Sequence, residues 1–174
     1  NNTAGGVGSS TIGYNNTATN ENASAFGYGN TAGGLASSAF GFSNTASGDN
    51  ANAFGYNNIA SGSKSNVFGT GNTVSGSSSN AVGTANEVAA ENSTAIGNNN
   101  TISSGAENSA ALGNNISISL KDSVALGNNS TATAINSVTG NSSYTKWTGV
   151  SDVVGVVSVG SSGSTRQIQN VAAG

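Results

Sequence analysis

A large apolar residue followed directly by Gly recurs at a fixed spacing along most of the chain. The glycines of this pair are fourteen residues apart from Gly13 to Gly97, sixteen apart to Gly113 and fourteen apart again to Gly127. Fourteen residues hold two strands of about four or five residues and two tight turns, whereas a pair of helices needs about twice that length. The spacing therefore predicts an all-β parallel solenoid with one coil per repeat, and a longer loop over 103–108.

Two apolar columns follow from this repeat. The residue before each Gly is large, and the residue before that one is small, most often Ala. Because side chains alternate along a strand, the two columns face opposite ways: one fills the narrow interior of a coil, and the other needs a partner. The large residues are Ile12, Phe26, Phe40, Phe54, Phe68, Val82, Ile96, Leu112 and Leu126, and we assign them to core or subunit packing.

Two further columns complete the repeat. The residue five positions after each Gly tends to be small where the residue before that Gly is large, as Ala32 is for Phe26. It tends to be larger where the residue before Gly is smaller, as Val88 is for Val82. This trade in volume predicts that the two columns share one packed space, within a coil or between subunits. An Asn column that includes Asn16 and Asn30 is expected to stack its amides in a ladder and to occupy left-handed corners.

Composition and charge narrow the function. Charged residues make up 6% of the 174 residues and the net charge is -3, whereas soluble proteins contain about 25% charged residues. Four bases cannot form a basic patch, so a nucleic-acid surface is excluded. No apolar stretch approaches the roughly 20 residues that span a bilayer, and no secretion signal is present. If the parent protein is secreted or anchored, we expect those segments outside this stretch.

The residue types also argue against catalysis. The chain contains neither His nor Cys, so the usual bases, nucleophiles and thiolate metal ligands are missing. The carboxylates are expected to occupy no single repeat position, and the closest pair, Glu87 and Glu91, is expected on solvated loops or turns. We therefore predict no enzyme activity, no cofactor and no metal site.

Two outer columns suggest binding surfaces. The residue after each repeat Gly is aromatic in the early coils, at Tyr14, Tyr28, Phe42 and Tyr56. These rings are candidates for contacting a carbohydrate or protein ligand, or alternatively they cover strand edges or pack between subunits. A Thr column fits a solvated strand face, and its remote alternative is an ice-binding solenoid. Ile59 and Glu87 interrupt that column.

The repeat fades after residue 132, and the chain end resembles a known family. Segment 133–157 contains the only Trp, Trp147, and residues 165–174 could begin a helix. The repeats Asn-Ser-Thr-Ala-Ile-Gly (92–97), Asn-Ser-Ala-Ala-Leu-Gly (108–113) and Asp-Ser-Val-Ala-Leu-Gly (122–127) resemble the YadA-like head of trimeric autotransporter adhesins. Val-Ser-Val-Gly (157–160), Arg-Gln-Ile (166–168) and Asn-Val-Ala-Ala-Gly (170–174) resemble the neck of that family.

The resemblance implies a left-handed β-roll that forms a homotrimer, with a head over 1–132, an insertion over 133–157 and a neck over 158–174 that leads to a coiled-coil stalk. In that neck, Arg166, Gln167 and Asn170 are expected to make contacts across subunits. The resemblance further implies a head at the bacterial cell surface, on a protein anchored in the outer membrane outside this stretch. Such a head attaches to host cells or extracellular-matrix proteins; alternatively, it is a structural spacer that presents another binding domain.

Overall fold

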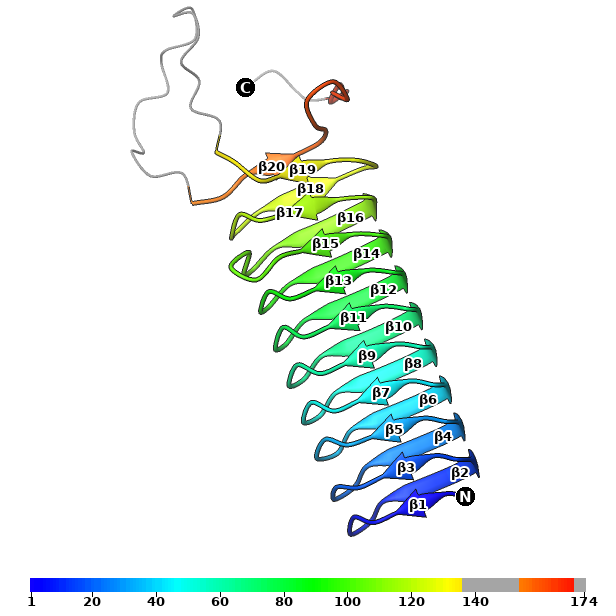
Figure 1. Ribbon diagram of the computed structural model, residues 1–174. Helices are drawn as coiled ribbons and strands as arrows, with labels where there is room; N and C mark the ends of the chain where they lie inside the picture. Colours follow the sequence, from blue (N-terminus) through cyan, green and yellow to red (C-terminus); the bar gives the residue numbers. More distant parts are fainter. Residues whose placement is uncertain (136–153, 171–174) are drawn as a thin grey trace, which may run out of the picture.

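The computed structural model of the chain describes residues 1–135 and 154–170, which form a single elongated roll of stacked coils (Figure 1). Each coil contributes one strand of two residues and one strand of up to five residues. The described residues contain no helix, including 165–170, where a helix start was expected. The prediction of an all-β parallel solenoid with fourteen-residue repeats is confirmed.

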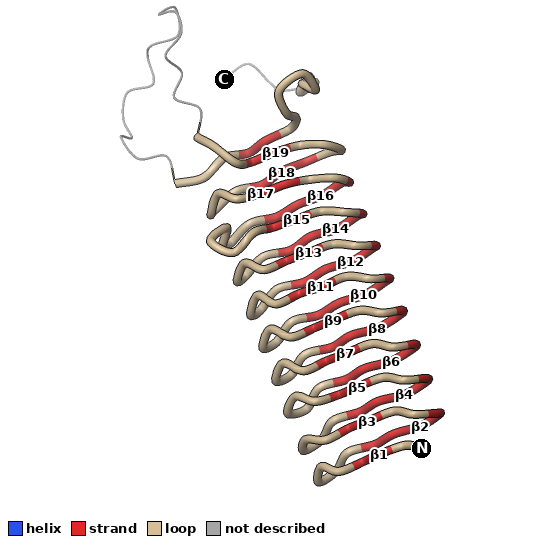
Figure 2. The backbone as a smooth tube through the Cα atoms, viewed as in Figure 1, coloured by secondary structure: helices blue, strands red, loops and turns tan. Residues whose placement is uncertain are grey.

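The strands form two ten-stranded sheets, one on each side of the roll (Figure 2). The short-strand sheet contains β1 (Thr3–Ala4), β3 (Thr17–Ala18), β5 (Thr31–Ala32), β7 (Thr45–Ala46), β9 (Ile59–Ala60), β11 (Thr73–Val74), β13 (Glu87–Val88), β15 (Thr101–Ile102), β17 (Ser117–Ile118) and β19 (Thr131–Ala132). The long-strand sheet contains β2 (Ser10–Tyr14), β4 (Ser24–Tyr28), β6 (Ser38–Phe42), β8 (Asn52–Tyr56), β10 (Asn66–Thr70), β12 (Asn80–Thr84), β14 (Thr94–Asn98), β16 (Ala110–Asn114), β18 (Val124–Leu126) and β20 (Val157–Ser158).

All these strands pair in parallel, and equivalent residues lie opposite each other in successive coils. Phe40 pairs with Phe54, for example, and Gly41 pairs with Gly55. The register is kept across the sixteen-residue step, where Asn98 pairs with Asn114, because the extra residues lie in the loop between β15 and β16. The expected loop over 103–108 is therefore confirmed.

The interior of the roll is narrow and contains small side chains. From β3 to β19, the second residue of each strand is almost completely buried, and in most long strands this residue is Ala. Ala25 and Ala32 are both fully buried, whereas Phe26, the neighbour of Ala25, points out of the sheet. The expectation that Phe26 and Ala32 share one packed space is wrong, because the long-strand sheet separates them.

A column of buried Asn side chains closes one side of the interior. Each Asn side chain binds the next along the column: Asn44 Nδ2 donates to Asn30 Oδ1 over 3.1 Å, and Asn58 Nδ2 donates to Asn44 Oδ1 over 3.0 Å. The predicted amide ladder is confirmed. The left-handed corner residue, however, is the one before each ladder Asn, as at Ser43 (φ 55°) and Asn57 (φ 54°).

The repeat Gly is required by the close approach of successive coils. Gly55 has a φ of 122°, which favours glycine. A Cβ on Gly55 would lie 2.1 Å from the carbonyl oxygen of Gly69 in the next coil. The large apolar residue before it is thus always followed by a residue without a side chain.

The segment that begins at residue 154 adds a further strand to the roll. Val157 of β20 pairs with Val124 of β18, so β20 adds one more long strand. The backbone nitrogen of Val156 donates to Ser123 Oγ over 3.1 Å. Val157 therefore belongs to the sheet. Trp147 and the middle of the predicted insertion lie outside the described residues, and the assignment of 158–174 to a neck stays a prediction.

Candidate functional site: the outer face of the long-strand sheet

Three columns of side chains form the outer face of the long-strand sheet, and we name them by their place in the strand. The strand-start column consists of Ser10, Ser24, Ser38, Asn52, Asn66, Asn80, Thr94, Ala110 and Val124. The pre-glycine column consists of the large apolar residues from Ile12 to Leu126. The post-glycine column consists of Tyr14, Tyr28, Phe42, Tyr56, Thr70, Thr84, Asn98, Asn114 and Asn128.

The pre-glycine column lies outside the core along the whole roll. The exposed fraction is 65% for Ile12, 44% for Phe68 and 50% for Leu112. The choice that the sequence left open is thereby decided: the Ala column fills the interior, and the large column faces outward. Phe26, Phe40 and Phe54 are half-buried, and the other residues of the column are exposed. An outward apolar column of this length is the mark of an interaction surface.

The aromatic residues of this face form two stacked ladders. Phe26, Phe40, Phe54 and Phe68 stack with ring centroids 4.7–5.2 Å apart. Tyr14, Tyr28, Phe42 and Tyr56 stack with centroids 4.9–5.4 Å apart. Because each ring face is covered by its neighbour, the ladders present ring edges to the outside. They fit a protein surface better than a sugar ring, which stacks on an open aromatic face.

The three columns of this face contain no charged residue from Ser10 to Asn128. Four carboxylates instead share one position at the turns between the short and long strands: Glu21, Asp49, Glu91 and Glu107. Their backbones stack, since Ala36 N donates to Glu21 O in the coil before. The seven carboxylates thus occupy no single repeat position, as expected, although these four share one.

Glu87 and the Thr column lie on the short-strand sheet, which has a polar face. Glu87 lies on β13 and not in a loop, which corrects the expectation for this residue, while Glu91 lies in a turn. The Thr residues of the short strands are mostly half-buried, and exposed Ile59 and Glu87 break their regular array. Ice binding depends on an unbroken array, so this face fits the solvated strand surface that was predicted.

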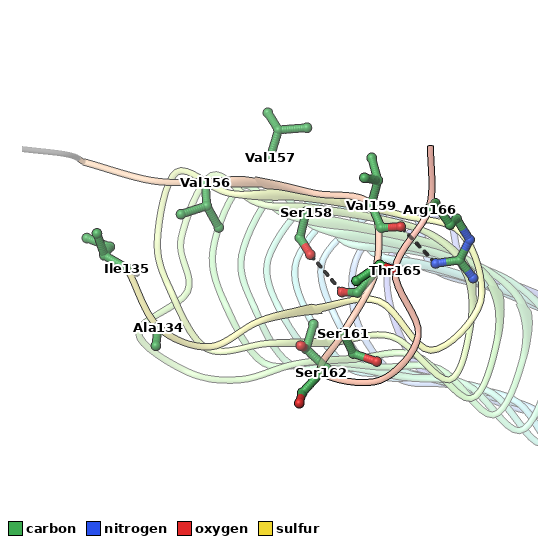
Figure 3. Close-up of a pocket in the computed structure, with 12 residues that line it drawn as sticks. Ala134, Ile135, Val156, Val157, Ser158, Val159, Ser161, Ser162, Thr165 and Arg166 are labelled. Carbon is green, nitrogen blue, oxygen red and sulfur yellow. Dashed lines mark hydrogen bonds between the residues drawn. The ribbon is translucent and has the colours of Figure 1, made fainter. Parts of the chain in front are cut away.

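The C-terminal end of the roll contains an open cavity of about 800 Å³ (Figure 3). Val156, Ser158 and Arg166 are among its lining residues. Arg166 Nη1 donates to Ser130 Oγ over 3.1 Å and to Val159 O over 2.9 Å, and Nη2 donates to Asn128 O. The guanidinium group thus attaches the segment 154–170 to the last complete coil.

The other two residues expected to form neck contacts lie on the surface of this segment. Gln167 and Asn170 are both exposed, and Gln167 Oε1 accepts from Gln169 Nε2 over 3.2 Å. The role of these three residues between subunits stays a prediction.

Residues 1–135 and 154–170 contain no group of three or more acidic, His or Cys side chains that could hold a metal ion. No helix in this part of the chain is long and apolar enough to cross a membrane.

The fold and this outer face define an elongated repeat protein, a parallel β-roll with an apolar column on the outer face of one sheet. The YadA head domain repeat matches residues 4–30, 32–58, 46–72, 75–100 and 121–138, which is more than half of the chain. The chain belongs to the YadA head family of trimeric autotransporter adhesins, whose heads are generally non-catalytic surface structures. No curated protein matches the chain.

Proposed function

We propose that this chain is the head of a bacterial surface adhesin and that it attaches to host cells or extracellular-matrix proteins as a homotrimer. One observation is central: the long-strand face has an apolar pre-glycine column along the whole roll and no charged residue from Ser10 to Asn128, in a chain of the YadA head family. Three such faces can meet around an axis without taking a charged group out of water, which is the main cost of a polar interface.

The trimer leaves the polar surfaces of each roll available for a ligand. The short-strand face lies on the other side of the roll from the long-strand face (Figure 1), and the turns with Glu21, Asp49, Glu91 and Glu107 join the two sheets along one edge. Three copies of an extended surface give avidity, so that weak contacts suffice for attachment. The adhesin stands on the cell surface, and its membrane anchor belongs to another part of the protein.

A mass measurement tests the trimer. We expect the 174-residue chain and its Thr45→Lys variant to be trimers by light scattering, because Thr45 lies on the polar face. Phe54→Lys places a charge in the apolar face, and we expect a monomer with an unchanged circular-dichroism spectrum. A folded monomer for the unaltered chain would contradict the proposal.

Binding to a panel of immobilised matrix proteins and to host cells tests the adhesin. Saturable binding by the trimeric chain supports it, with the Phe54→Lys monomer expected to bind more weakly through the loss of avidity. Trimers that bind no member of the panel and no cells would instead favour the structural spacer.

A further inference from the structure

The apolar surface of the long-strand face does not follow one column but shifts across the strands from one end of the roll to the other. In the first coils, the pre-glycine and post-glycine columns are both apolar, as at Phe26 and Tyr28, while the strand-start residue is polar Ser24. In the middle coils only the pre-glycine column is apolar, as at Val82 between Asn80 and Thr84.

In the last coils the strand-start column becomes apolar and the post-glycine column becomes polar. Val124 and Leu126 stand beside Asn128, and Val157 of β20 continues the strand-start column. Val157 is 72% exposed. Figure 3 shows the side chains of Val157 and Val159 directed away from the interior and those of Val156 and Ser158 directed toward it.

The shift is a property of the sequence and not of the strand pairing. Equivalent residues pair from coil to coil, so each column follows the roll without slipping: Ser24 pairs with Ser38, and Ala110 pairs with Val124. The centre of the apolar surface moves by two residues, or about 7 Å, over about six coils at about 4.8 Å each. The apolar stripe therefore crosses the roll at about 13°.

We infer that three copies of this chain wind around one another along an oblique seam, with the subunit contact passing from the post-glycine column at the N-terminal end to the strand-start column at the C-terminal end. This inference rests on the proposed trimer. It assigns Tyr14, Tyr28, Phe42 and Tyr56 to the subunit interface at the N-terminal end of the roll. At the opposite end, Ala110, Val124 and Val157 take the same role.

A second copy is the occupant that fits this stripe. The stripe extends along every coil, so a partner must be as long as the roll and apolar along the same oblique line. Cyclic symmetry brings the same coil of each copy to the same height, where aromatic coils meet aromatic coils. The apolar stripe crosses the long axis of the roll obliquely. Three rolls can therefore keep their stripes in contact only by winding around one another, as the helices of a coiled coil do.

Four Lys substitutions in the full chain test the seam. Tyr28→Lys and Val124→Lys place a charge inside the seam, whereas Ser24→Lys and Asn128→Lys place one beside it, at the same two levels of the roll. We expect the first two to weaken the trimer about a hundredfold, seen as dissociation on dilution in light scattering, and the last two to leave it intact. All four side chains point away from the core, so circular dichroism should stay unchanged.

Other patterns would overturn the inference while leaving the trimer standing. If Ser24→Lys and Val124→Lys both dissociate a chain that is otherwise trimeric, the seam is straight and follows the strand-start column. If Tyr28→Lys keeps the trimer but abolishes binding to a matrix protein that the unaltered chain binds, the aromatic ladder is a ligand strip. A monomeric unaltered chain would instead refute the proposed trimer itself.

Discussion

The buried amide ladder predicts that Asn58→Ala lowers the thermal stability of the roll much more than Asn20→Ala does. Asn58 is fully buried, and its Nδ2 approaches three oxygens: Asn44 Oδ1 at 3.0 Å, Phe54 O at 3.0 Å and Gly69 O at 2.7 Å. Its Oδ1 accepts from the backbone nitrogen and from Nδ2 of Asn72, each over 3.0 Å. One side chain therefore joins three successive coils.

The cost of Asn58→Ala follows from what it leaves unpaired. The backbone N–H of Asn72 loses its acceptor in a buried place, which costs about 1–3 kcal/mol. The two Nδ2 protons of Asn58 can donate two hydrogen bonds, whose loss adds about 1 kcal/mol each, so the total is about 3–5 kcal/mol. For a chain of this size, such a loss lowers the midpoint of thermal unfolding by about 10 °C.

Asn20→Ala is the matched control. Asn20 is exposed, and its Nδ2 donates to Gly33 O at the surface. We expect its midpoint to change by about 2 °C at most. Far-UV circular dichroism measures both variants at one protein concentration, because assembly makes the midpoint depend on concentration. Equal midpoints for the two variants would refute the claim that the ladder holds the coils together.

Three other substitutions test separate parts of the roll. Gly55→Ala should prevent stable folding, because its Cβ would lie 2.1 Å from the carbonyl oxygen of Gly69. The Cβ of Gly71→Ala would meet no atom within 4 Å, so this change should cost only about 1 kcal/mol of folding stability. Soluble yield and thermal unfolding distinguish the two variants. Ile118→Ala empties a fully buried position and should cost about 2–5 kcal/mol in denaturant unfolding. Arg166→Lys should weaken the attachment of residues 154–170 to Ser130. Limited proteolysis should then cut 154–170 faster while the earlier coils stay protected.

The sequence alone was enough to predict the solenoid, its period and its amide ladder. These features repeat at one fixed step, and a stack of parallel coils is the structure in which equivalent residues become neighbours. The longer loop could be placed for the same reason, since the steps before and after it are equal. Strand alternation also predicted two opposed apolar columns.

Only the tertiary structure decided which column lies inside. Alternation gives two faces without saying which is buried; the two sheets lie so close that Ala25 fits between them and Phe26 must face outward. The sequence spacing of Glu21 and Asp49 is a multiple of fourteen, so their shared repeat position could be read from the sequence. Only the stacking of the turns in the structure places these carboxylates along one edge of the roll. The contact of Arg166 with Ser130, 36 residues away, could not be predicted from the repeat, because Arg166 lies outside the repeating part of the sequence.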